Sequence, residues 1–140
     1  LTVKKVLGRE LIRPGVVYLP ADDRHLVATN AGYFMTSAAP ASDGHRPSVD
    51  VLLASLAMIY GPHASGVILS GIGQDGVRGL LAMRDQGALT MAQCEESCAV
   101  FGMPQAALNS GAARLMLTPE AMAKELQRFA GARGLRRLAR

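Results

Sequence analysis

One stretch decides the fold of this chain: Val67-Ile68-Leu69-Ser70-Gly71-Ile72-Gly73-Gln74-Asp75-Gly76. Its first residues are a short, continuous apolar run, which is typical of a β-strand covered on both faces. After the glycine-rich turn, Val77, Leu80 and Leu81 provide the inward face of a helix that we expect to end at Gly87. The stretch therefore predicts a strand, a turn and a helix, which is the repeating unit of parallel α/β sheets.

The same alternation of helices and strands extends in both directions from this stretch. Upstream, residues 47–60 predict a helix that begins at Pro47-Ser48, has one apolar face and stops at Gly61-Pro62. Downstream, the pattern predicts strands at residues 88–92 and 114–117, a helix within residues 100–108, and a last helix that Thr118-Pro119 caps and whose apolar face is Met122, Leu126 and Phe129. Strict alternation argues for parallel strands joined by right-handed crossovers. The predicted fold class is therefore α/β, with three α/β/α layers and a mostly parallel sheet.

The first 45 residues have a different pattern, made of short strands and turns. Residues 16–19 predict an apolar strand after the Pro14-Gly15 turn. Two further segments, residues 25–29 and residues 33–36, predict a β-hairpin around Asn30-Ala31-Gly32. We therefore expect a β-hairpin in addition to the parallel sheet.

Size and composition indicate one globular domain, because the chain has 140 residues, of which 49% are apolar and 19% charged. No apolar run approaches the ~18 residues that span a bilayer, and the first residues lack the order of a signal peptide. We therefore expect a cytoplasmic protein without membrane insertion. The chain begins with Leu1 and not with Met, and we interpret this as the loss of a preceding segment.

The net charge of +4 comes from the end of the chain, where the last eight residues include four arginines, Arg133, Arg136, Arg137 and Arg140. The rest of the chain has equal numbers of basic and acidic side chains. A neutral body with three Tyr, three Phe and no Trp lacks the basic and aromatic face that nucleic acids require, so no nucleic-acid partner is expected. We interpret residues 131–140 as a basic tail that forms a solvated helix, in preference to a tag for a membrane surface or a partner.

The cysteines and histidines predict neither a metal site nor a redox site. Cys94 and Cys98 are four positions apart, a spacing that neither a Cys-x-x-Cys redox site nor a paired-cysteine zinc site uses, so we interpret them as reduced, structural thiols. His25 and His63 are interpreted as surface histidines. Since no set of His, Cys and Asp residues has the spacing of metal ligands, we expect no metal and no cofactor.

The turn at residues 70–76 is the candidate site, because open α/β sheets bind ligands at the carboxyl ends of their strands. Gly71-x-Gly73-x-x-Gly76 satisfies the dinucleotide-binding fingerprint, and Glu95 follows at the distance of a ribose-binding acid. Against this interpretation, Asp75 places a carboxylate where a pyrophosphate would need the helix N-terminus. A dinucleotide-binding module is therefore the weaker interpretation.

Asp75 itself has two interpretations. It can be an N-cap, whose carboxylate accepts N–H bonds at a helix start and contributes ~1 kcal/mol to stability. It can also be a catalytic acid at the end of a strand. On the residues alone the cap is favoured, because helix caps greatly outnumber catalytic acids.

Several segments change that balance, because they resemble one family in its order and at its spacing. The turn Gly71-Ile72-Gly73-Gln74-Asp75-Gly76 resembles the Gly-Met-Gly-x-Asp-Gly signature of the CheB-type protein-glutamate methylesterases. Three other segments are similar to family segments: Arg13-Pro14-Gly15-Val16-Val17-Tyr18, His45-Arg46-Pro47-Ser48-Val49-Asp50, and Ala92-Gln93 with the following Glu96-Ser97-Cys98-Ala99-Val100-Phe101-Gly102-Met103-Pro104. The similarity extends to about Phe129, so we expect residues 1–130 to be the C-terminal portion of such a catalytic domain.

The resemblance implies an activity and a role for each residue of the turn. In that family a Ser nucleophile, a His base and an Asp hydrolyse the γ-methyl esters of glutamates on methyl-accepting chemotaxis receptors, and some members deamidate receptor glutamines. The Asp corresponds to Asp75, which would accept the His ring N–H and stabilise the imidazolium. The oxyanion-hole N–H corresponds to Ile72, where the family has Met, in an active-site turn that includes Gly71, Gly73 and Gly76. The resemblance also implies receptors as partners and a possible receiver domain upstream of this chain.

The chain departs from the family at its front. The segments that carry the family's Ser nucleophile and His base have no counterpart and would precede Leu1, so we expect a sheet that is incomplete at the N-terminus and an isolated chain without esterase activity. Ser70, His45 and Asp75 could be drawn as a substitute triad, but Ser70 is better explained by backbone bonding at the strand end and His45 by support of its loop. The alternative to a cut enzyme is a short, non-catalytic remnant that binds receptors.

Overall fold

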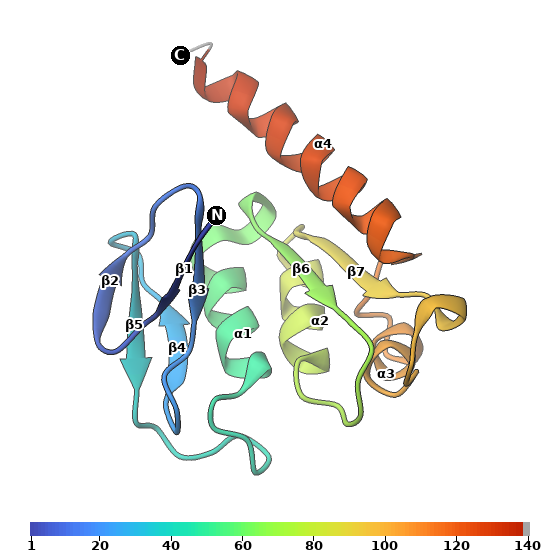
Figure 1. Ribbon diagram of the computed structural model, residues 1–140, viewed down its shortest axis with the longest axis horizontal. Helices are drawn as coiled ribbons and strands as arrows, with labels where there is room; N and C mark the ends of the chain where they lie inside the picture. Colours follow the sequence, from blue (N-terminus) through green and yellow to red (C-terminus); the bar gives the residue numbers. More distant parts are fainter. Residues whose placement is uncertain (139–140) are drawn as a thin grey trace.

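The computed structural model describes the backbone of residues 1–138 and the side chains of residues 1–132. Its central sheet has three parallel strands in the order β6-β7-β8, of which β6 and β7 are labelled in Figure 1. The strands are β6 (Ser65–Ile68), β7 (Leu89–Gln93) and β8 (Leu115–Leu117). A helix lies in each connection: α2 (Val77–Asp85) between β6 and β7, and α3 (Met103–Asn109) between β7 and β8. The predicted α/β class with parallel strands is confirmed.

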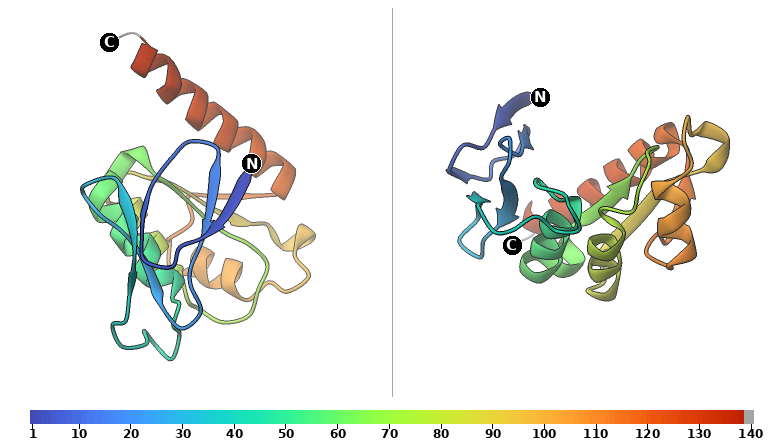
Figure 2. Two further views of the ribbon diagram at one scale, coloured as in Figure 1. Left: turned by 60° about the vertical axis from the view of Figure 1, so that its left-hand side comes forward. Right: turned by 90° about the horizontal axis from the view of Figure 1, so that it is seen from below.

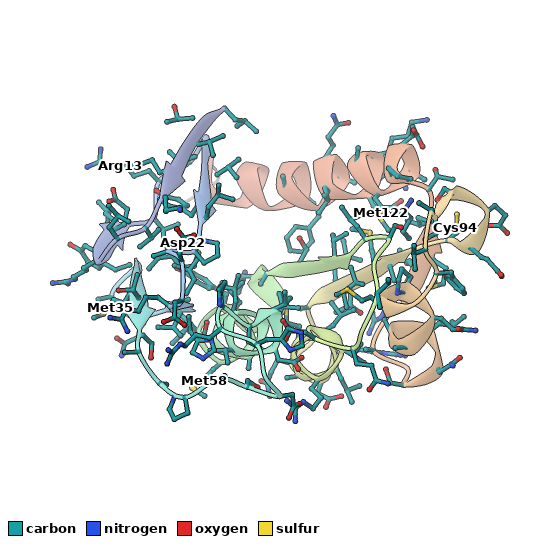
Figure 3. All side chains as sticks on the ribbon, turned by 60° about the horizontal axis from the view of Figure 1, so that its bottom comes forward. Arg13, Asp22, Met35, Met58, Cys94 and Met122 are labelled. Carbon is teal, nitrogen blue, oxygen red and sulfur yellow. The ribbon has the colours of Figure 1, made fainter. Side chains whose placement is uncertain are left out.

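Helices lie on both faces of this sheet, so the three predicted layers are present. α2 and α3 cover one face, and α1 (Val49–Tyr60) lies beside α2 in the same layer (Figure 2, right). α4 (Pro119–Leu138) crosses the opposite face (Figure 3). Thr118 caps α4, as predicted, since its Oγ1 accepts the Ala121 N–H at 3.2 Å.

The core lies between the sheet and these helices. Leu80 and Met83 of α2 and Met91 of β7 are completely buried. On the other face, Met122 of α4 is 3% exposed and lies between the helix and the sheet (Figure 3). Leu80, from the apolar face predicted for α2, and Met122, from the face predicted for α4, therefore lie in this core.

Two small sheets precede α1. β1 (Thr2–Lys5) pairs in parallel with β3 (Val16–Leu19), while β4 (His25–Ala28) and β5 (Tyr33–Ser37) form the predicted antiparallel hairpin. β2 (Arg9–Leu11) adds to the free edge of β5, a pairing that the sequence pattern did not predict. These strands lie on the outer side of α1 (Figure 1), and β4 packs directly against that helix.

α1 and α2 approach each other closely at a glycine. A Cβ atom at Gly79 would lie 2.7 Å from the Cβ of Leu53 and 2.8 Å from the carbonyl oxygen of Asp50, so a side chain there would push the helices apart. Ser48 is the N-cap of α1, and its Oγ accepts the Val51 N–H at 3.4 Å. The close contact brings the start of α1 next to the start of α2, which is the helix that follows the candidate turn.

Several element boundaries differ by one or two residues from the sequence-based expectations, and the environment of one histidine differs as well. β6 begins and ends one residue before the predicted strand 66–69, because the chain already turns away at Leu69, whose side chain is 54% exposed. The prediction of a surface histidine at position 25 is wrong: His25 is 1% exposed and bonds to the Pro40 carbonyl and the Ser48 N–H. His63 is exposed, as predicted.

The end of the chain is helical as far as it is described. α4 continues to Leu138, so residues 131–138 of the predicted basic tail extend this helix. The side chains of its four arginines lie outside the described residues. Among the helices that the structure describes, none is both long and apolar enough to cross a membrane.

Candidate functional site

Ser70 follows β6 and holds the base of the turn. Its N–H donates to Gln93 Oε1 at 2.9 Å. Its hydroxyl accepts the Val100 N–H at 2.9 Å and lies 3.2 Å from the Val100 carbonyl oxygen, to which it donates. The hydroxyl therefore satisfies backbone groups at the strand end, as the sequence predicted.

Gly71 connects the turn to the loop before α3. Its N–H donates to the Val100 carbonyl at 3.0 Å, and its own carbonyl accepts the N–H groups of Gly102 at 3.2 Å and Met103 at 2.9 Å. Gly102 has no space for a side chain, because a Cβ atom there would lie 2.8 Å from the Gly71 oxygen and 3.4 Å from the Ile72 Cα. The backbone at residues 71 and 72 is thus held by the loop of residues 100–103.

Ile72 lies at the exposed tip of the turn. Its side chain is 83% exposed, and within the described part of the chain its N–H has no hydrogen-bond acceptor. Gly73 and Gly76 have φ angles of +102° and +101°, which residues with side chains rarely adopt. The glycines of the turn therefore give the backbone its shape. Among the described residues, the N–H of Ile72 is one of four consecutive backbone donors without an acceptor, from Ile72 to Asp75.

Asp75 turns away from α2, the helix that follows it, and toward the start of α1. Its Oδ1 accepts the Ser48 hydroxyl at 2.7 Å and the Asp50 N–H at 3.1 Å. Its Oδ2 accepts the Val49 N–H at 2.8 Å. Asp75 is thus a helix cap, but of α1 and not of the helix that it precedes; the N-cap of α2 is Gly76, which has no side-chain cap bond.

Asp50 caps α2 instead. It lies in the first turn of α1, is 8% exposed, and its Oδ1 accepts the N–H groups of Gly76 at 3.0 Å and Gly79 at 2.7 Å. Its Oδ2 forms an ion pair with Arg78 Nε at 3.3 Å. Sequence reasoning assigned no role to Asp50, since no local pattern indicates that an acid of one helix caps the next. Its only signal was its place at the end of the family-like segment 45–50.

The start of α2 is therefore already occupied by an anion. A pyrophosphate would need the N–H groups of the first turn of this helix, but the Asp50 carboxylate accepts two of them. The sequence indicated Asp75 as the carboxylate that opposes a dinucleotide. In the structure, the carboxylate at this position is that of Asp50. Glu95 lies in the exposed short helix η2 (Glu95–Ser97). The geometry disfavours the dinucleotide interpretation.

The environment of Asp75 favours its ionised form. Burial alone would raise the pKa of this carboxyl group, but the three hydrogen bonds from the start of α1 outweigh burial and hold the pKa below its ordinary value. The positive charge of His45 lowers the pKa further. Asp75 is therefore a carboxylate at neutral pH, which is the form that can accept a hydrogen bond from an imidazole.

The substitute triad of Ser70, His45 and Asp75 is not assembled. The Ser70 hydroxyl is bonded to the backbone of Val100, and His45 Nδ1 lies 3.0 Å from the Asp43 carbonyl within its own exposed loop. His45 thus supports its loop, as expected. None of the Ser, His and Asp side chains of this set is hydrogen-bonded to another in the described structure.

The cysteines follow β7 and lie on either side of the short helix η2 (Glu95–Ser97); Cys94 is labelled in Figure 3. Cys94 and Cys98 are free thiols. Burial raises the pKa of Cys98, and nearby Cys94, Glu95 and Glu96 raise it further. In the described residues no group of three His, Cys, Asp or Glu side chains could hold a metal ion.

Fold and turn together define a three-layer α/β domain that carries an acidic, glycine-rich turn at the carboxyl end of a parallel strand. The model of the CheB methylesterase family matches residues 1–126. The chain therefore belongs to the CheB methylesterase family.

Individual relatives agree with this assignment. The chain is 43% identical over 137 residues to protein-glutamate methylesterase/protein-glutamine glutaminase 4 of Anaeromyxobacter dehalogenans, covering 96% of this chain and 38% of that protein. It is 50% identical over 115 residues to the protein-glutamate methylesterase/protein-glutamine glutaminase of Photorhabdus laumondii, covering 80% of this chain and 33% of that protein. The chain thus spans about a third of the length of these relatives.

A solved structure has the same fold. The crystal structure of the Thermotoga maritima CheB methylesterase catalytic domain superposes with a TM-score of 0.82 and 32% sequence identity. The match covers 88% of this chain and 67% of that chain. The predicted resemblance and the predicted fold class are confirmed by these similarities.

Proposed function

We propose that residues 1–130 act as the C-terminal part of a catalytic domain that hydrolyses glutamate γ-methyl esters on chemotaxis receptors and deamidates receptor glutamines. Family membership and the names of the relatives support this proposal. Because the chain spans about a third of those relatives, the substrate and partners of the whole protein belong to the proposal as well. It further includes a cytoplasmic location and an upstream receiver domain.

The observation that carries the proposal is the state of the Asp75 carboxylate. Donors at the start of α1 hold both oxygens, and the lowered pKa keeps the group ionised. In a Ser-His-Asp hydrolase this is the state that accepts the His ring N–H, fixes the tautomer and stabilises the imidazolium while Ser is deprotonated. The serine and the histidine would come from segments that residues 1–138 do not supply.

Ile72 is proposed to supply an oxyanion-hole donor from its backbone. When the deprotonated serine attacks the ester carbonyl, negative charge develops on the carbonyl oxygen before methanol leaves. A backbone N–H without an acceptor in the described structure is suited to stabilise that charge. The exposed Ile72 side chain does not enter this role, so isoleucine can replace the family's methionine.

The direct test is Asp75→Asn in a protein that joins this chain to the family's serine and histidine segments. We expect kcat for methanol release from methylated receptor to fall by 10²–10⁴, or ~3–5 kcal/mol, because Asn cannot stabilise an imidazolium. Asp23→Asn is the control, since Asp23 is another aspartate that binds through its carboxylate, in its case to Arg46. A rate that survives Asp75→Asn within about threefold would reduce Asp75 to a helix cap.

The alternative function, a non-catalytic module that binds receptors, is tested on the 140-residue chain itself. Within the described residues no histidine ring bonds to Asp75, so we expect no methanol release from this chain. Turnover that Ser70→Ala abolishes would contradict the assignment and restore the substitute triad. Receptor binding by the chain, combined with failure of the joined protein to release methanol, would support the non-catalytic module.

A further inference from the structure

Among the residues that the structure describes, three donors bind the carboxylate of Asp75 and leave one acceptor position unfilled. An ionised carboxylate offers about four lone-pair positions, two on each oxygen. Oδ1 uses both, for the Ser48 hydroxyl at 2.7 Å and the Asp50 N–H at 3.1 Å. Oδ2 uses one, for the Val49 N–H at 2.8 Å. A further donor can therefore be accepted only by Oδ2 without displacing a bond that the structure already contains.

Ser48 is the side chain that makes the two oxygens different. Val49 and Asp50 donate from the backbone, which every residue type can do, but the shortest of the three bonds comes from the Ser48 hydroxyl. The same Oγ accepts the Val51 N–H as the N-cap of α1. Ser48 thus fixes Asp75 to the helix start and directs Oδ1 away from any later partner.

The backbone of Ser48 is in turn fixed by a hydrogen bond to the ring of His25. The Ser48 N–H donates to His25 Nδ1 at 3.2 Å, and His25 Nε2 lies 3.1 Å from the Pro40 carbonyl, to which it donates. Both residues are buried, with 3% exposure for Ser48 and 1% for His25. A buried hydrogen-bonded chain therefore runs from β4 through the start of α1 to the Asp75 carboxylate.

Asp50 holds the other side of the same turn. Its carboxylate accepts the Gly76 N–H directly after Asp75, while its own N–H donates to Asp75 Oδ1. Movement of the turn relative to α1 would break bonds in both directions. The position of Asp75 is thus fixed both through its side chain and through the backbone that follows it.

From this arrangement we propose that Ser48 is a positioning residue of the active site, which together with Asp50 orients Asp75 so that Oδ2 is the oxygen that accepts the imidazole N–H of the catalytic base. This inference rests on the proposed function, because it assigns a partner to Asp75. It adds to the Ser-His-Asp scheme the group that determines which carboxylate oxygen is used.

The first test uses the 140-residue chain and needs no turnover. Carboxyl-carbon NMR gives the pKa of Asp75, and the amide protons of Val49 and Asp50 should titrate together with it. In Ser48→Ala we expect the pKa of Asp75 to rise and these two amide signals to move, because a hydrogen bond to the ionised form is lost. If Ser48→Ala does not fold, Ser48→Gly is used, since Gly replaces Ser at an N-cap with a loss of only a few tenths of a kcal/mol.

Ser55→Ala is the matched control. Like Ser48, Ser55 lies at α1 and accepts one backbone N–H, from Ala28 at 2.9 Å, while it donates to one acceptor, the Leu52 carbonyl at 2.7 Å. Its loss should lower stability without any change in the pKa of Asp75. Equal titration curves for Asp75 in Ser48→Ala and Ser55→Ala would overturn the inference.

The second test measures turnover in the protein that also carries the family's serine and histidine. We expect Ser48→Ala to lower kcat about tenfold with KM unchanged within twofold, Ser48→Thr to restore the rate, and Ser55→Ala to leave it unchanged. Tenfold corresponds to ~1.4 kcal/mol, close to the lower limit for one hydrogen bond to a charged group. An unchanged kcat in Ser48→Ala would overturn only the role of Ser48 and would leave the proposed function intact. Full turnover in Asp75→Asn would overturn the proposed function, so the two failures are distinct.

Discussion

Asp50 and Asp75 cap each other's helices. Asp75, directly before α2, accepts N–H groups from the start of α1, and Asp50, in the first turn of α1, accepts those of Gly76 and Gly79 at the start of α2. One N–H joins the pair directly, from Asp50 to Asp75 Oδ1 at 3.1 Å. The positive ends of two helix dipoles meet here and offset the repulsion of two carboxylates. This reciprocal capping fixes the turn of residues 70–76 to the starts of α1 and α2.

Asp50→Ala should destabilise the chain strongly, whereas Asp50→Asn should not. Alanine leaves the buried N–H groups of Gly76 and Gly79 without their acceptor, a loss of ~1–3 kcal/mol for each group and about 3 kcal/mol in total. Asparagine retains an oxygen for both donors and loses mainly the ion pair with Arg78, whose side chain is 65% exposed, so the expected loss is under ~1 kcal/mol. Urea unfolding of both variants measures the difference. Equal losses would show that charge, and not capping, is the main contribution of Asp50.

Stability should fall in acid, partly through Asp75. The folded pKa of Asp75 lies below the ordinary value of 3.8, so its contribution to stability is fully present above that value and is lost as the pH falls through the folded pKa. We expect the difference in unfolding free energy between the wild type and Asp75→Asn to be constant above about pH 5 and to shrink below about pH 4. Chemical denaturation at a series of pH values gives this difference.

The wild-type curve alone would not isolate Asp75. The hydrogen bond and charge of Arg46 also hold the pKa of Asp23 below its ordinary value, so both residues lose stabilisation in the same pH range. Asp23→Asn measured in parallel separates them. A difference between wild type and Asp75→Asn that does not change with pH would contradict a lowered pKa at Asp75.

The elements could be predicted because their signals are local. The apolar face of α1 and its end at Gly61, or the short apolar runs of β6 and β7, are contained in a dozen neighbouring residues. The pairing of β2 with β5 was not predicted, since nothing within residues 9–11 specifies which strand edge they join. Local periodicity indicates the element but not its partner.

The candidate site could be predicted only in part, for the same reason. The turn and Asp75 belong to one motif, but the donors that hold Asp75 precede it by 25 to 27 positions. The burial of His25 depends equally on a distant contact, with Ser48. A histidine next to charged residues is typical of a surface, and only the packing of β4 against α1 reverses that expectation.

Gly102→Ala tests whether the loop before α3 holds the turn in its functional shape. The added methyl group would lie 2.8 Å from the Gly71 oxygen and 3.4 Å from the Ile72 Cα, so the loop and the turn must separate. We expect a loss of ~1–3 kcal/mol in stability from overpacking. In the protein that carries the family's serine and histidine, kcat should fall at least about tenfold, because misplacement of a catalytic group by ~1 Å can lower the rate 10²-fold.

Gly131→Ala is the control, since Gly131 lies in α4 with nothing within 4 Å of its Cβ position. This variant should gain up to ~1 kcal/mol in stability at an unchanged rate. Both variants are compared by urea unfolding, by the amide NMR signal of Ile72 and by kcat. An unmoved Ile72 signal with full turnover in Gly102→Ala would mean that the turn keeps its shape without this loop.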